Sequence, residues 1–74
     1  MDIFEKNQEV YIRDFPYGKP TRIKGIIVAH LKNNLYNIKI LNGLDEGKIK
    51  MYYDYRISDI SYEDYMLELE KSGV

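Results

Sequence analysis

The chain has 74 residues, no cysteine and a formal net charge of −1 at pH 7. This length leaves room for one domain with one core. The absence of cysteine excludes disulfides, thiolate zinc sites and a cysteine nucleophile, and it fits a reducing compartment. No apolar run approaches the roughly 20 residues that span a bilayer, and the first ten residues do not resemble a secretory signal. We therefore expect a single cytoplasmic domain over residues 1–74 and no membrane partner.

The charges are unevenly spread along the chain. Residues 10–57 carry nine basic and four acidic side chains, whereas residues 58–74 carry one basic and five acidic side chains. A basic body beside an acidic end can mark a surface for an acidic partner. The alternative is that lysines decorate exposed strand faces for solubility. The bias toward Ile, Lys, Asn and Tyr is typical of an AT-rich genome, such as that of a low-GC bacterium or its phage.

The first two predicted strands flank a loop. Residues 9–13 alternate, which puts Val10 and Ile12 on one face. Both prolines and a glycine interrupt the pattern after residue 13, so residues 14–21 form an irregular loop. Residues 22–31 are β-branched and predict a long strand. Three consecutive apolar residues at 26–28 leave its facing ambiguous, and Gly25 indicates a bulge or a close crossing.

Two further strands follow a tight turn. Asn33 and Asn34 suit a hairpin turn, because asparagine tolerates positive φ. Residues 35–41 form the clearest half-buried strand, with Tyr36, Ile38 and Ile40 on its inner face.

After a turn-rich connection at residues 42–47, residues 48–52 alternate again. We expect Ile49 and Met51 to face inward, with Lys48, Lys50 and Tyr52 facing outward. Residues 53–56 predict a single 3₁₀ turn, and Ile57 is the expected core contact of a last short strand.

The pattern changes to a helical period near the end of the chain. Ser61 is a candidate N-cap for a helix over residues 62–71, with Asp64 in the capping-box position. Tyr62, Tyr65, Met66 and Leu69 form one apolar stripe. A helix of about three turns is marginal alone, so the stripe needs a surface to pack on. Its own sheet is the default, and a second copy or a different protein are the alternatives.

Together these segments resemble an SH3-like barrel of the Tudor, Agenet or KOW type. The matching elements are FEKNQEVYI, the loop that holds Phe15 and Tyr17, IKGIIVAHL, LYNIKIL with its Y-x-I-x-I pattern, GKIKMYY and RISDI. The resemblance implies a mainly β fold, a five-stranded barrel over about residues 4–60, with the short C-terminal α-helix as an addition. Members of such families bind peptides, modified side chains or nucleic acid and are generally not catalysts.

No residue pattern points to catalysis, a metal or a cofactor. His30 is the sole histidine, and it lies in a predicted strand without the partners that a general base needs. The three serines lie near the tail, outside any nucleophile motif. We predict no catalytic residue, no metal ligand and no cofactor.

Aromatic residues are the stronger signal for a partner-binding surface. The chain has eight tyrosines, and three of them cluster at residues 52–55. Tyrosine combines an apolar face with a hydroxyl group, which suits binding surfaces. Ordinary barrel packing is the competing interpretation. By analogy with Tudor-like barrels, where loop and strand aromatics form a pocket, the candidates are Tyr11, Phe15, Tyr17, Tyr52, Tyr53 and Tyr55.

The sequence therefore favours a non-catalytic module that binds another protein, such as a small phage or bacterial adaptor or inhibitor. The alternative is a nucleic-acid-binding domain of the KOW or Tudor kind, in which basic strand faces contact phosphates. The acidic balance of the whole chain argues against that alternative. A homo-oligomer is also compatible with the sequence. The basic candidates are Arg22, Lys24, Lys39, Lys48 and Lys50.

Overall fold

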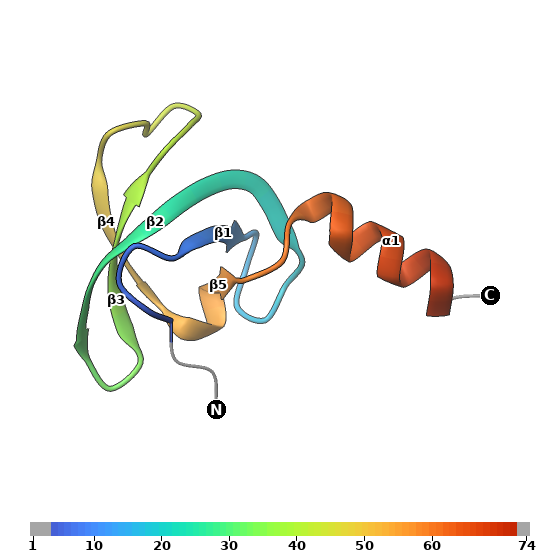
Figure 1. The fold of residues 1–74 in the computed structure, drawn as a ribbon, viewed down its shortest axis with the longest axis horizontal. Coiled ribbons are helices and arrows are strands. Elements are labelled where there is room, and N and C mark those ends of the chain that lie inside the picture. The colour runs from blue at the N-terminus through green and yellow to red at the C-terminus, as the bar shows by residue number, and fades with distance from the viewer. Residues whose placement is uncertain (1–3, 73–74) are drawn as a thin grey trace.

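A computed structural model describes residues 4–72 and has five antiparallel strands in one sheet, followed by a helix (Figure 1). The strands are β1 (Glu9–Arg13), β2 (Pro20–Lys32), β3 (Leu35–Ile40), β4 (Ile49–Tyr53) and β5 (Ile57–Ser58). A 3₁₀ turn, η1 (Asp54–Arg56), joins β4 to β5, and the helix α1 spans Tyr62–Ser72. The mainly β architecture, the 3₁₀ turn and the C-terminal helix are as predicted.

Strand β2 organises the sheet, because it pairs with a different neighbour along each half. Its first half pairs with β1, where Ile26 lies opposite Glu9, and its second half pairs with β3, where Ile27 lies opposite Ile38. To serve both neighbours, β2 bends in a long arc across the molecule (Figure 1). The strand order β4-β3-β2-β1-β5 leaves β4 and β5 as the two edges of the sheet within residues 4–72.

Gly25 of β2 lies where the ladder with β1 and the ladder with β3 overlap. It lies opposite Val10 of β1 and also opposite Ile40 of β3. A Cβ at this position would overlap the Cγ2 methyl of Ile38 and lie 3.3 Å from the carbonyl oxygen of Lys39. The prediction of a close crossing at Gly25 is confirmed. The bulge itself lies further along β2, where the register shifts between Ile27 and Ala29.

The core lies inside the bend of the sheet. The predicted inward residues of β1, β3 and β5 are buried, and Ile27 joins them from β2. The predicted hairpin at residues 33–34 is confirmed, with Asn33 at a φ of 52°. The buried hydrophobic residues among those described are Phe4, Val10, Ile12, Ile27, Tyr36, Ile38, Ile40 and Ile57.

The predicted facing of β4 is wrong. Tyr52 packs against the core, whereas Ile49 and Met51 are 58% and 63% exposed. The cause is the register with β3, which sets Tyr52 opposite the buried Tyr36 and Met51 opposite Asn37. Tyr52 therefore determines which face of β4 is turned inward, although the alternation of smaller apolar residues suggested the reverse.

Residues 4–8 lead into β1 and contribute one ring of a buried aromatic pair. The rings of Phe4 and Tyr36 meet edge to face at 5.5 Å, and the backbone N–H of Phe4 donates to the Tyr36 hydroxyl (3.2 Å). Backbone hydrogen bonds from Asn7 to Ile27 and from Ile27 to Gln8 fix this lead-in against β2. Phe4 is thereby a core residue, 8% exposed, and its remaining exposed edge lines a cavity.

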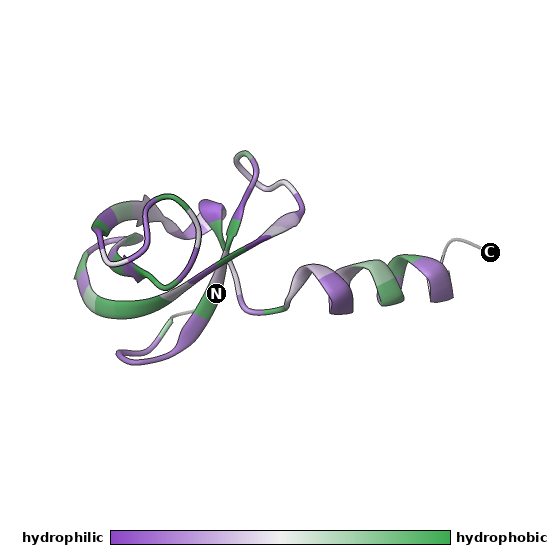
Figure 2. Ribbon diagram, turned by 90° about the horizontal axis from the view of Figure 1, so that it is seen from above, coloured by the Kyte–Doolittle hydropathy of each residue, from purple (hydrophilic) through white to green (hydrophobic). Residues whose placement is uncertain are grey.

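Helix α1 begins as predicted but contacts the sheet only at its first turn. The N–H of Asp64 donates to Oγ of Ser61 (3.0 Å), as an N-cap requires. Arg22 of β2 donates to Glu63 (2.9 Å) and stacks on the Tyr62 ring at 4.3 Å. None of the helix residues is buried, and the remaining turns project away from the sheet (Figure 2). The default expectation that the stripe packs on its own sheet therefore holds for the first turn alone.

A buried serine forms the joint between β5 and α1. Ser58 is 1% exposed, and its hydroxyl both donates to the carbonyl oxygen of Ile60 and accepts from the N–H of Ile60. These two hydrogen bonds form a local turn over residues 58–60, between β5 and α1. This turn ends where Ser61 caps the helix.

We predict that Gly25→Ala destabilises the protein by about 1–3 kcal/mol, because the added methyl must displace Ile38 in a packed core. Urea denaturation followed by circular dichroism measures the change. Gly43→Asn is the control, since nothing lies within 4 Å of a Cβ there and asparagine tolerates positive φ. A stability of Gly25→Ala equal to that of the wild type would contradict the close crossing.

We also predict that the contact between the first turn of α1 and β2 weakens on acidification. The hydrogen bond and charge of Arg22 lower the pKa of the Glu63 carboxyl. The ion pair therefore stabilises the docked helix above about pH 4.3, the ordinary glutamate value, and this contribution is lost as pH falls through the lowered pKa. NMR shifts of the Tyr62 ring should report the transition. Glu63→Gln should lack it, and an unchanged acid transition in that variant would refute the assignment.

Candidate partner-binding site

The loop between β1 and β2 contains a type II turn at Phe15–Gly18. The N–H of Gly18 donates to the carbonyl oxygen of Phe15 (2.7 Å), which closes the four-residue turn. Pro16 restricts its own φ to negative values, whereas Tyr17 has a φ of 61°. Negative φ at the second position and positive φ at the third define type II. The third position of such a turn ordinarily favours glycine.

Tyr17 is thus a tyrosine in a backbone conformation that costs an ordinary residue about 1 kcal/mol. Burial does not compensate for this cost, because Tyr17 is 82% exposed. Its N–H donates to the carbonyl oxygen of Tyr55 (2.8 Å), which fixes the turn against η1. An exposed aromatic ring held in a strained backbone is a feature that clusters at functional sites.

The turn brings Tyr17 into a row of three tyrosines. The Tyr17 and Tyr55 rings lie 5.4 Å apart at 34°, and the Tyr55 and Tyr53 rings lie 5.4 Å apart at 13°. We call these three residues the tyrosine ladder. It runs from the β1–β2 loop across η1 to the end of β4. The structure thus brings three of the six predicted aromatic candidates together.

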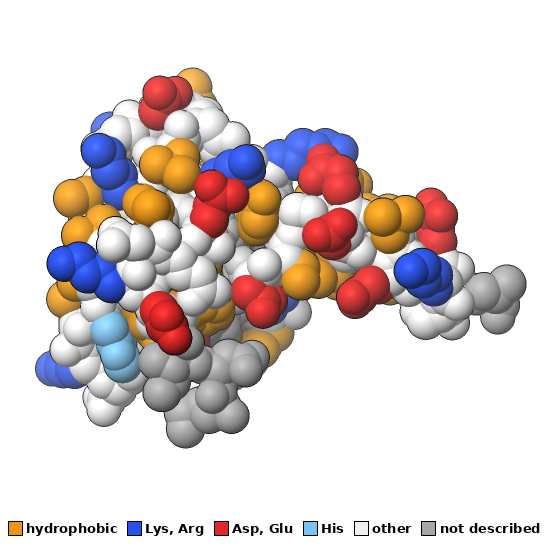
Figure 3. Space-filling view, viewed as in Figure 1, with side chains coloured by type: hydrophobic (Ala, Val, Ile, Leu, Met, Phe, Trp, Pro, Cys, Tyr) orange, Lys and Arg blue, Asp and Glu red, His pale blue; other side chains and the backbone are white. Residues whose placement is uncertain are grey.

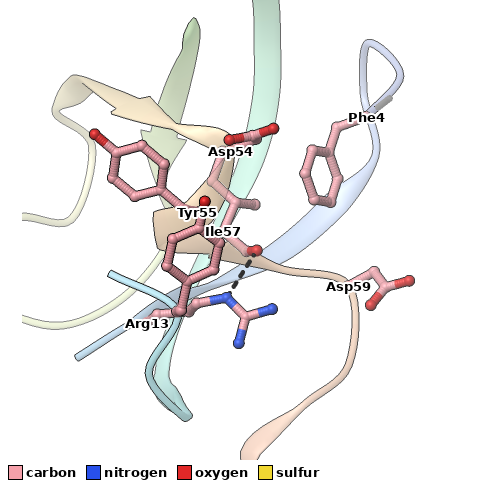
Figure 4. A pocket seen from close by; sticks show the side chains of 7 residues that line it. Phe4, Arg13, Asp54, Tyr55, Ile57 and Asp59 are labelled. Atoms are coloured by element: carbon pink, nitrogen blue, oxygen red, sulfur yellow. Dashed lines mark hydrogen bonds between the residues drawn. The ribbon is translucent and has the colours of Figure 1, made fainter. Parts of the chain in front are cut away.

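A cavity of about 300 Å³ opens beside the tyrosine ladder. Figure 4 shows Phe4 and Tyr55 on opposite sides of it, with Arg13 below and Asp54 above. The cavity draws on the lead-in, β1, the β1–β2 loop, η1 and the segment after β5. The lining residues are Phe4, Arg13, Tyr17, Asp54, Tyr55, Ile57 and Asp59.

Arg13 forms the floor of the cavity and ties three segments together. Its Nε donates to the carbonyl oxygen of Ile57 (3.1 Å; Figure 4), and one terminal nitrogen donates to the carbonyl oxygen of Gly18 (2.6 Å). Nε of Arg56 in turn donates to the backbone carbonyl oxygen of Arg13 (3.2 Å). These bonds fix the loop, β1 and β5 relative to one another, so the cavity is preformed.

Two carboxylates, Asp54 and Asp59, line the cavity together with the Arg13 guanidinium and leave it with an excess of one negative charge. Asp54 is oriented by Asn34, whose side-chain amide donates to it (3.2 Å) and whose carbonyl oxygen accepts its N–H (2.8 Å). Asp59 lies on the opposite side of the cavity from Tyr55 (Figure 4). Aromatic faces with nearby carboxylates favour a cationic group over a neutral one.

The other three aromatic candidates lie apart from the cavity. Tyr11 is half-buried on β1, opposite Lys24 and Ser58. Phe15 is exposed in the turn but does not line the cavity. Tyr52 packs on the core and lines a second, smaller cavity of about 180 Å³ at the β3–β4 hairpin.

Sequence reasoning missed five residues of the main cavity, namely Phe4, Arg13, Asp54, Asp59 and Ile57, the last of which was predicted only as a core residue. Each has an ordinary appearance in the sequence, and only the packing of distant segments brings them together. One signal was present: in the segment Phe-Pro-Tyr-Gly, proline fixes a turn that leaves tyrosine at the position suited to glycine.

Most basic candidates for the alternative function are engaged by carboxylates. Arg22 pairs with Glu63, and Lys24 lies 3.7 Å from Glu9. Lys48 and Lys50 both pair with Asp45, which lowers the pKa of that carboxyl mainly through its hydrogen bond with Lys50. Within residues 4–72, Lys39 is the member of this set that forms no ion pair. Figure 3 shows blue and red side chains interspersed over this face, and no broad basic patch.

His30 contributes to hairpin structure. Its ring stacks on Tyr36 at 4.5 Å, and Nε2 lies 2.6 Å from the carbonyl oxygen of Asn33, to which it donates. Over the described part of the chain, histidine and acidic residues form no cluster of three or more that could hold a metal ion. No helix in that same part is long and apolar enough to cross a membrane.

Comparison with known proteins returns no protein family, no curated protein and no solved structure that matches the chain.

We predict that Tyr17→Gly is more stable than Tyr17→Ala by about 1 kcal/mol, because alanine retains the positive-φ strain that glycine relieves. Urea denaturation of the two variants measures the difference. The same pair at Tyr11, a β-strand residue, is the control, and there glycine should be the less stable. Equal stability at position 17 would contradict the strained turn.

Proposed function

We propose that the chain is a non-catalytic protein-binding module whose tyrosine ladder and adjacent cavity receive a segment of another protein. The observation that carries this proposal is the exposed ring of Tyr17, held at positive φ against Tyr55. The contact with the Tyr55 ring does not by itself require a tyrosine that is 82% exposed. A binding surface gives a reason for one, since tyrosine supplies broad contact area with few rotatable bonds.

We further propose that the curled sheet is an SH3-like barrel of the Tudor, Agenet or KOW type. The order of the connections supports this: an irregular loop after β1, a tight hairpin between β2 and β3, a longer connection over residues 41–48, and a 3₁₀ turn before a short last strand. In such barrels the first loop and the segment before the last strand border the binding surface. Here those same two segments are joined by the Tyr17–Tyr55 hydrogen bond.

The chemistry of the cavity favours a basic side chain of the partner. The aliphatic stem of lysine or arginine can lie between Phe4 and Tyr55, while its charged end approaches Asp54 or Asp59. Arg13 already donates to two backbone carbonyls, so its role is to hold the floor in place. A partner segment with lysine or arginine beside an apolar residue fits the cavity and the ladder together.

A small adaptor or inhibitor that acts in the cytoplasm is the biological role we propose. The lack of cysteine supports a reducing compartment. The engagement of His30 with a backbone carbonyl supports a module without general-base chemistry. Both points support the proposal without identifying the partner.

Nucleic-acid binding is the second candidate, because the nearly parallel rings of Tyr53 and Tyr55 are a platform on which bases can stack. The ion pairs of Arg22, Lys24, Lys48 and Lys50 weaken this candidate, since these charges would have to leave their carboxylates to meet phosphates. Fluorescence anisotropy with labelled single-stranded DNA and RNA at low salt tests it. Micromolar binding that weakens steeply with added salt would favour nucleic acid over protein.

The test of the protein-binding proposal is a random-peptide display selection against the folded protein, counter-selected with Tyr17→Gly. That variant removes the ring and relieves the strain, so loss of binding cannot be attributed to unfolding. We expect enrichment of peptides that contain lysine or arginine and bind at least about tenfold more weakly to Tyr17→Gly. Phe15→Ala, in the same turn but outside the cavity lining, is the matched control and should bind as the wild type does. Peptides that bind both variants equally would refute the proposed site.

The preference for a cation is tested separately by NMR titration with short blocked peptides. Lysine and arginine peptides should shift the signals of Tyr17, Asp54, Tyr55 and Asp59, whereas norleucine and citrulline analogues of the same size should shift them less. Asp54→Asn should reduce the difference because it removes one cavity carboxylate and leaves the size of the side chain unchanged. Equal shifts with charged and neutral peptides would contradict the preference.

A further inference from the structure

Two apolar surfaces of the molecule have no cover within the described chain. The first is the outer face of β4, where Ile49 and Met51 are mostly exposed beside Tyr53. On the neighbouring strand, Leu35 and Asn37 share this face, because they lie opposite Tyr53 and Met51. We call this surface the β4 patch. An edge strand with apolar residues on its outer face invites association unless something covers it.

The second uncovered surface is the stripe on α1. At 100° per residue, Tyr65, Met66 and Leu69 continue one side of the helix from Tyr62, while Leu67 lies away from it. Tyr62 and Glu63 meet the sheet through Arg22, whereas Tyr65 and Met66 are half-buried and Leu69 is 46% exposed. An 11-residue helix is marginal in water unless its stripe packs on another surface.

The β4 patch and the α1 stripe lie too far apart to cover each other within one chain. Figure 1, with the longest axis horizontal, shows β4 at one end of the molecule and α1 at the other. Two copies placed side by side in opposite directions would bring each helix beside the β4 patch of the other copy. The arrangement is closed and two-fold symmetric, so it satisfies both surfaces of both copies at once.

The charges that border the two surfaces are complementary. Lys39 lies opposite Ile49 and Lys32 lies opposite Leu35, so basic side chains stand at the two ends of the β4 patch. Glu68 and Glu70 stand on either side of the α1 stripe. Within residues 4–72, none of these four side chains is in an ion pair of its own chain. Opposite charges at the rim favour this pairing over helix-to-helix or patch-to-patch contact, which would set like charges together.

We propose that the protein forms a homodimer by reciprocal helix docking, in which α1 of each copy packs its stripe on the β4 patch of the other. The contact buries Met51 and Leu69 at its centre, with the lysines and glutamates at its rim. It leaves the cavity beside Tyr17 in each copy outside the core of the interface. Tyr53 belongs to both the β4 patch and the tyrosine ladder, so the two proposals share this residue. Substitutions at Met51 and Leu69 change neither the ladder nor the lining of the cavity and therefore test the dimer separately.

Sedimentation equilibrium of the full chain over a range of concentrations tests the dimer. Met51→Glu and Leu69→Glu should each weaken association by about tenfold or more, because each places a charge at the centre of the contact. Leu44→Glu and Leu67→Glu are the matched controls, since both residues are exposed and lie outside the two surfaces. Circular dichroism should show all four variants folded. A wild type that stays monomeric up to about millimolar concentration overturns the proposal.

A mixing experiment distinguishes reciprocal docking from other dimers. In a mixture of Met51→Glu and Leu69→Glu, the intact helix of the first variant meets the intact patch of the second. The heterodimer keeps one wild-type contact and places both substitutions in the other, whereas each homodimer has one substitution in both contacts. Because one charge at the centre is enough to break a contact, we expect heterodimers that bind more tightly than either variant binds itself. If contact were helix to helix or patch to patch, the mixture would gain no such pair. A Leu69→Glu variant that dimerises as the wild type does, or a mixture without heterodimers, overturns the arrangement.

The charge pairing is tested without assuming which lysine meets which glutamate. The variant Lys32→Glu/Lys39→Glu should dimerise about two- to fivefold more weakly for each ion pair that it removes from the rim. Adding Glu68→Lys and Glu70→Lys should restore the affinity, because the complementary charges return with reversed sign. A combined variant weaker than the first one would show that these charges do not face each other and would overturn this arrangement of the interface.

Discussion

The close contact between Gly25 of β2 and Ile38 of β3 is the constraint on which the rest of the structure depends. Because Gly25 has no side chain, Ile38 can occupy the space between the two ladders of β2. The sheet can then curl around a core built from few residues, as a chain of this length requires. The curl also brings the β1–β2 loop next to η1, where the N–H of Tyr17 reaches the carbonyl oxygen of Tyr55. The cavity is thus a consequence of how tightly the sheet bends.

Much of the fold could be predicted because local patterns and long-range packing agree along most of the chain. The alternation in β1 and β3 places Val10, Ile12 and Ile38 in the core, and the capping serine begins the helix where expected. In β4 the two disagree. Both faces carry residues that can be buried, and only the pairing of Tyr52 with Tyr36 decides between them. The sequence pattern of a strand shows that buried and exposed residues alternate. Pairing with the neighbouring strand decides which of the two sets is buried.

The candidate binding site was predictable only in its aromatic part. Tyr17, Tyr53 and Tyr55 stand out because aromatic residues in a loop and at a strand end are frequent in binding surfaces. Arg13 and Asp59 become part of the cavity through contacts between segments more than forty residues apart, such as the bond from Arg13 to Ile57. No local pattern encodes such a contact. For the basic residues, the charges could be read from the sequence, but the carboxylates that pair with them could not.

The hydrogen-bonded turn at Ser58 bears on how α1 behaves as a mechanical element. A helix attached through an unstructured tether would sample many directions, and a surface that captured it would have to overcome the entropy of that freedom. Here the buried hydroxyl holds the connection to Ile60 at both its N–H and its carbonyl, immediately before the N-cap. The turn therefore restricts the directions that the helix can take relative to the sheet. The Ser58 turn, together with the contacts of Arg22 to Tyr62 and Glu63, sets the direction in which the helix extends beyond the core.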